Sequence, residues 1–147
     1  MWNPATAVLW ESWRLSRLPM AIAMFLATLG GAALIVLPFP GEMGVTLTVP
    51  WVIYLAWFSQ HWALKIDGRK GFSLLAGFSR PIPTWVLVTV PMAYVAASSA
   101  VTYLVPILVL RTAFSIPLPH LPVAALVATV SLSLGAFSWS SANPVRR

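Results

Sequence analysis

The fold is decided by IPTWVLVTVPMAYVAASSAVTYLVPILVL, residues 82–110, a run of 29 residues without a charged side chain. About 20 predominantly apolar residues are enough for a helix to cross the hydrocarbon core of a bilayer. A helix is the default spanning structure because it satisfies its own backbone hydrogen bonds. Since this run is longer than the bilayer requires, we expect it to tilt, to kink at Pro91 or Pro106, or to begin in the interface.

Three further runs of similar character flank this one, at residues 18–37, 45–64 and 121–139. The chain has 147 residues, of which 59% are hydrophobic and 8% are charged, whereas about 25% are charged in an ordinary soluble domain. No internal repeat or linker divides it. The sequence therefore predicts an all-α, polytopic membrane protein, with residues 1–147 forming one integral membrane domain of four transmembrane helices.

The distribution of basic residues predicts the orientation of these spans. The net charge is +6, and the Lys and Arg residues fall in small clusters between apolar runs, which suits anionic lipid headgroups better than a nucleic-acid groove. With both termini cytoplasmic, only Arg111 lies outside, and eight basic residues lie inside: Arg14, Arg17, Lys65, Arg69, Lys70, Arg80, Arg146 and Arg147. This positive-inside pattern predicts an integral protein of a bacterial inner membrane that contacts lipids and no nucleic acid.

The segment before the first span has the features of an interfacial helix. Asn3 can cap a helix whose first position is Pro4. Beyond the cap lie membrane-interface candidates, namely Trp10, Trp13, Arg14 and Arg17, in which tryptophans beside arginines favour the headgroup layer. We expect Pro19 to break this helix from the first span. The alternative is a cytoplasmic extension of that span anchored by aromatic residues.

Small residues recur every four positions on two of the predicted spans. They lie at Ala23, Ala27 and Gly31 on the first span, and at Ala93, Ala97, Ala96 and Ala100 on the third. Such spacing lets helices approach closely in lipid. These stripes predict packing faces, and the hydroxyls of residues 98, 99, 102 and 103 predict bonds between helices.

Enzyme chemistry finds little support in the residues. Cysteine is absent, and the three acids, Glu11, Glu42 and Asp67, are scattered over both predicted membrane faces. No ionisable residue lies deep inside a span, and no phosphate-binding glycine loop is present. The sequence therefore predicts a chain that is not an enzyme and that holds no metal.

His61 and His120 are the two imidazoles, and the topology places them near opposite surfaces, so a shared haem or metal site is not expected. His61 alone is a weak candidate as an axial ligand to haem or a pigment. Its alternative is an interfacial histidine that meets headgroups.

The connector KIDGRKGFSLLAGFSRPIP, residues 65–83, joins the second and third spans on the cytoplasmic side. Its first part is basic and turn-forming, and FSLLAGF is bounded by Gly71 and Gly77. We expect a short amphipathic cytoplasmic helix here. An apolar helix at this place requires a partner, either lipid or a protein on the cytoplasmic side.

This order of elements resembles the start of the permease subunits of ABC-type exporters. The phrase formed by residues 78–82, FSRPI, is similar to one that precedes the third span in that family. The resemblance implies that residues 71–79 are a coupling helix that docks on a separate ATPase, and that the N-terminal segment is the family's connecting helix. The partner-binding candidates are Phe72, Leu74, Leu75, Phe78 and Arg80. The resemblance covers the family's first four spans of six.

Two functional hypotheses follow, and a third is weaker. The first is a non-catalytic, permease-like subunit of an export system, coupled to a cytoplasmic ATPase that holds the ATP, with no cofactor in this chain. The alternative is a small accessory or scaffolding subunit packed on a larger respiratory or photosynthetic complex, where haem or pigment could be contacted. An oligomeric small-molecule transporter would place a strongly polar residue near the midplane, and none is evident.

Overall fold

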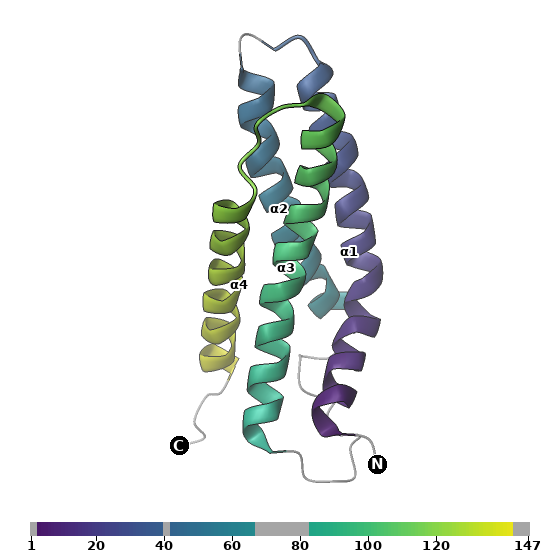
Figure 1. Cartoon of the computed structure of the whole chain (residues 1–147). Helices are drawn as coiled ribbons and strands as arrows, with labels where there is room; N and C mark the ends of the chain where they lie inside the picture. Colours follow the sequence, from purple (N-terminus) through teal and green to yellow (C-terminus); the bar gives the residue numbers. More distant parts are fainter. Residues whose placement is uncertain (1–2, 40–41, 67–82, 143–147) are drawn as a thin grey trace.

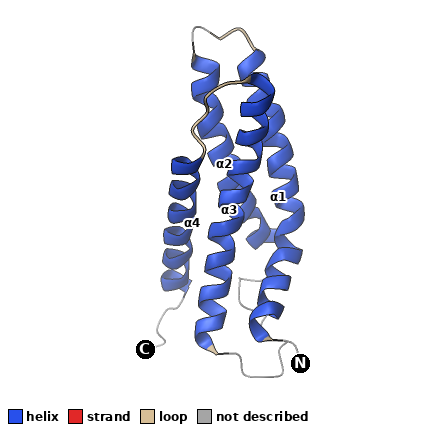
Figure 2. Ribbon diagram, viewed as in Figure 1, coloured by secondary structure: helices blue, strands red, loops and turns tan. Residues whose placement is uncertain are grey.

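The computed structural model describes residues 3–39, 42–66 and 83–142, and these form four α-helices without a strand (Figures 1 and 2). The helices are α1 (Pro4–Val36), α2 (Met43–Ile66), α3 (Thr84–Phe114) and α4 (Leu121–Ala142). The predicted all-α class is confirmed. The predicted spans 45–64, 82–110 and 121–139 agree with α2, α3 and α4 to within four residues at each end.

Helix α1 begins as the sequence predicts. The Oδ1 atom of Asn3 accepts a hydrogen bond of 3.0 Å from the backbone N–H of Ala5, and Pro4 occupies the first turn. This cap satisfies one of the amide donors that the start of a helix leaves without an intrahelical partner.

The predicted break at Pro19 is wrong, because α1 continues through this residue to Val36. A proline inside a helix removes one backbone hydrogen bond and crowds the preceding turn, at a cost of about 3 kcal/mol. The buried face offsets this cost, since it keeps its helical spacing on both sides of Pro19, at Ser16, Met20 and Ala23. Residues 4–18 are therefore an extension of the first helix and not a separate interfacial one.

Helix α3 also accommodates its prolines, Pro91 and Pro106, without ending at either. It runs past Leu110 to Phe114, so that Arg111, expected in a loop, lies in the last helical turn. Ser115 follows with a φ of 55°, in the left-handed region, and ends the helix.

The four helices pack as an up-and-down bundle with α3 at its centre (Figure 1). Helix α1 packs on α2 and α3, and α3 also packs on α4, whereas α1 and α4 do not touch within the described ranges. The start of α1 and the end of α4 lie at the same end of the bundle (Figure 1).

Helix α4 is offset along the bundle relative to the hairpin of α1 and α2 (Figure 1). The hydroxyl of Tyr103 donates a hydrogen bond of 2.6 Å to the carbonyl of Pro119, just before α4 begins. Helix α3 extends 11 residues beyond Tyr103, about 16 Å at 1.5 Å per residue. Residues 115–120 therefore return alongside α3 before α4 starts, and Leu118 in this return is buried.

Two stretches of the described chain are long and apolar enough to cross a membrane: α1 and the part of α3 from Val88 to Phe114. The described apolar part of α4, Leu121–Leu134, is shorter.

Candidate functional site

The interior of the bundle is rich in hydroxyl groups. Buried Ser and Thr side chains donate hydrogen bonds of 2.7 to 3.1 Å to carbonyls three or four residues earlier in their own helices; these are Ser16, Thr48, Ser59, Ser98, Ser99 and Thr102. A hydroxyl can donate one hydrogen bond and can also accept. These six hydroxyls are thus satisfied as donors within their own helices and remain available as acceptors.

A polar cluster joins α1 to α3 near one end of the bundle. The hydroxyls of Ser16 and Tyr94 lie within hydrogen-bond distance of each other, and the Tyr94 hydroxyl is also 3.7 Å from the sulfur of Met20. Ser16 in turn donates to the carbonyl of Ser12 at 2.9 Å. These contacts hold the turns of α1 that precede Pro19 against α3.

Gln60 of α2 is a buried amide of the same interior. It is 8% exposed, and its Nε2 atom has no hydrogen-bond acceptor in the described structure. Val52, Ala56 and Gln60 are buried at four-residue spacing, which places the amide on the face of α2 that meets the bundle. This spacing is the sequence signal that could have identified Gln60 as an interior residue.

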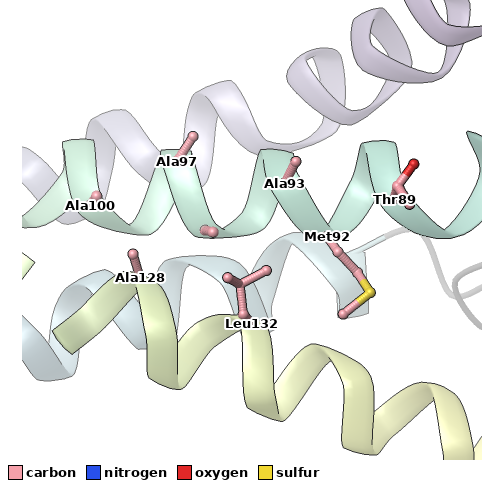
Figure 3. A pocket seen from close by; sticks show the side chains of 8 residues that line it. Thr89, Met92, Ala93, Ala97, Ala100, Ala128 and Leu132 are labelled. Carbon is pink, nitrogen blue, oxygen red and sulfur yellow. The ribbon is translucent and has the colours of Figure 1, made fainter. Parts of the chain in front are cut away.

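A groove of about 560 Å³ lies between α3 and α4. Figure 3 shows Ala128 and Leu132 directed from α4 toward α3, with Met92 reaching from α3. The lining is apolar except for Thr89, whose hydroxyl donates at 2.7 Å to the carbonyl of Trp85. The groove therefore offers an apolar surface and no free hydroxyl proton for chemistry.

The two alanine stripes have different environments. Ala23, Ala27 and Gly31 are buried in the bundle, which confirms the predicted packing face of the first helix. A Cβ added to Gly31 would lie 2.5 Å from Leu110 Cδ1, so α1 and α3 approach closely here. Ala93 and Ala97, in contrast, are exposed and line the groove.

The predicted interface residues lie along the first turns of α1. Trp10, Trp13, Arg14 and Arg17 are all exposed. Arg14 forms an ion pair of 2.6 Å with Glu11, one turn earlier. Such an exposed pair contributes at most about 1 kcal/mol.

The predicted partner-binding residues lie outside the described residues; they are Phe72, Leu74, Leu75, Phe78 and Arg80. His61 lies in α2, but its side chain is also outside what the structure describes. The other histidine, His120, is engaged by Arg111, whose Nη1 atom lies 2.9 Å from the ring Nδ1.

Across the described ranges, no group of three or more His, Asp or Glu side chains converges on a common point, as a metal site would require. Comparison with known proteins finds no matching family, no matching curated protein and no matching solved structure.

Proposed function

We propose that the chain is a non-catalytic, membrane-spanning subunit whose four helical segments all cross a bilayer. The observation that carries this proposal is the distribution of side chains, with hydroxyls inside and large apolar groups outside. Leu18, Phe25, Trp85 and Leu121 are each more than 60% exposed, among many similar residues. A soluble protein rarely exposes a continuous apolar surface of this kind, whereas lipid accommodates it.

The positions of the charged residues support the same proposal. Gly31 of α1 contacts Thr48 of α2. Counting seventeen residues from this contact, back along α1 and forward along α2, brings Arg14 level with Lys65. Residues 17–37 rise about 30 Å, the thickness of the hydrocarbon core. Basic residues therefore mark one boundary of the bilayer, and Arg111 lies near the other.

Cysteine labelling tests the membrane assignment cleanly, because the chain has no cysteine of its own. A cysteine at Phe25 (F25C) is expected to resist a charged maleimide in sealed vesicles and to react after denaturation in detergent. Thr6→Cys, at an exposed position in the first turns of α1, is the matched control and should react from one side of the membrane. Equal, fast labelling at both positions would overturn the assignment.

The finer proposal is a permease-like subunit that couples to a separate cytoplasmic ATPase. It rests on the resemblance of residues 78–82 and their position between two apolar helices. We expect Leu74→Glu, Leu75→Glu or Phe78→Glu to release an ATPase that co-purifies with the wild-type chain. Ser73→Glu adds the same charge at an already polar position, and it should retain the ATPase. Retention by all four variants would refute the coupling.

The same purification tests the accessory-subunit alternative. A subunit of a respiratory or photosynthetic complex should co-purify in fixed stoichiometry with chains that carry redox groups or pigments. A visible absorption spectrum distinguishes the two assemblies, since a colourless assembly with ATPase activity excludes the alternative.

A further inference from the structure

Gln60 presents two N–H donors to the interior of the bundle, and no group in the described structure accepts from them. Buried polar atoms in folded proteins nearly always have a partner, either a protein group or an ordered water. The hydroxyl of Ser59, the preceding residue, is by contrast engaged with the carbonyl of Ala56 at 2.8 Å. The unpaired amide therefore needs an acceptor of its own.

The register of α1 and α2 places Pro19, whose missing N–H affects one backbone carbonyl of α1, near the level of Gln60. Counting from the contact between Gly31 and Thr48, twelve residues along each helix bring Pro19 level with Gln60. Both residues are buried. Because proline has no N–H, the carbonyl of Leu15, four residues earlier in α1, lacks its normal helical donor.

We propose that a single water molecule is bound between α1 and α2 at this level. It accepts a hydrogen bond from Nε2 of Gln60 and donates one to the carbonyl of Leu15. Its second proton is directed to the hydroxyl pair of Ser16 and Tyr94, which lies one turn away and has acceptor capacity. A buried water of this kind typically makes about three hydrogen bonds to groups that would otherwise be unpaired.

This water site explains two features together. The helix tolerates Pro19 in a buried position because the carbonyl released by the proline is satisfied from α2. The amide of Gln60 tolerates burial because the water carries its hydrogen bond to α1. The bridge thus links the two helices at the point where α1 lacks a backbone hydrogen bond.

The direction in which one substitution shifts the thermal unfolding midpoint tests the proposal. Gln60→Met keeps the length of the side chain and removes the donor. If the amide is bridged, the thermal midpoint of the purified protein should fall by about 3 °C or more. A midpoint that rises or stays unchanged would show that Gln60 has no partner to lose, and it would overturn the proposal.

A double-mutant cycle with Pro19→Ala identifies the acceptor. Alanine restores an N–H that takes the Leu15 carbonyl away from the water, so Gln60→Met should cost less in the Pro19→Ala background than in wild type. Additive effects would overturn the bridge to Leu15. Ser59→Ala is the matched control, because its hydroxyl is bonded within its own helix, and it should show no coupling to Pro19→Ala.

A measurement on the unmodified chain makes the test independent of how well the variants fold. In detergent micelles, the side-chain amide protons of Gln60 should show an NMR cross-relaxation peak to a long-lived water. The lack of such a peak, with the amide resonance assigned, would also overturn the proposal.

Discussion

Gly44 brings the backbones of α1 and α2 into direct contact beside the hairpin that joins them. A Cβ atom at this position would collide with the carbonyl oxygen of Leu34. Gly30 is also crowded, but there the obstacle is the indole ring of Trp51. A ring can rotate aside, whereas a helical carbonyl can move only if the helix moves. The two glycines therefore differ in how much a methyl group would disturb them.

We expect Gly44→Ala to destabilise the bundle by about 1–3 kcal/mol, the usual cost of overpacking. Gly30→Ala should cost less, because the side chain of Trp51 can yield. Thermal unfolding of the two variants in the same detergent gives the comparison. If Gly44→Ala proves the milder change, then α1 and α2 do not approach as closely as described.

Tyr103 fixes the return of the chain from α3 to α4. The residue is fully buried, and its hydroxyl donates to the carbonyl of Pro119. Tyr103→Phe leaves this carbonyl without its donor and should reduce stability by about 1–3 kcal/mol. Tyr54→Phe, on the exposed surface of α2, is the control and should have little effect. Equal midpoints for both variants would argue against a structural role for the Tyr103 hydroxyl.

The helices show which sequence signals were sufficient to predict where a helix begins and ends, and which were not. Long uncharged runs predicted the bounds of α2, α3 and α4 closely. Pro19 was misleading, since the local penalty of a proline was outweighed by packing of the first turns of α1 on α3. That packing depends on Ser16 and Tyr94, which are 78 residues apart and share no local signal.

The contact between Ser16 and Tyr94 should control the order of the first part of α1. We expect Tyr94→Phe to increase amide hydrogen exchange in residues 4–16, with little change in residues 23–36, because the turns before Pro19 would lose their bond to α3. Tyr54→Phe is again the control. Uniform exchange in both halves of α1 would show that the helix opens as one unit and that the contact has no local effect.

For the whole molecule, the sequence predicted the all-α fold class but not how the four helices are positioned relative to one another. Composition predicted an all-helical chain, but no pattern indicated that α4 begins level with the middle of the bundle and not beside the hairpin of α1 and α2. The segment from Ser115 to His120 joins two predicted spans, and the sequence did not indicate how it lies against α3. Its actual position depends on Leu118 and Pro119 packing against α3, a contact that composition and periodicity do not report.

This offset predicts a difference in labelling between two exposed positions. Leu121, at the start of α4, is 66% exposed, and Phe39, beside the hairpin of α1 and α2, is 37% exposed. Leu121→Cys should nevertheless react much more slowly with a charged maleimide in sealed vesicles, because lipid shields it. Both cysteines should react after solubilisation and denaturation. Faster labelling at Leu121 would place α4 at the aqueous surface.

For a chain that spans a bilayer as proposed, the low starting point of α4 has a consequence for the surrounding lipids. On the side of α1 and α2, the apolar helical surface extends over the full height of the bundle. On the side of α4, the helical surface ends about 16 Å lower, and residues 115–120 cover part of this difference. Hydrocarbon chains beside α4 still cover Leu121, but they must splay over residues 115–120, and each ångström of mismatch has a small energetic cost. The protein should therefore create a step in membrane thickness around its circumference, and neighbouring proteins should gather on the side whose height matches their own.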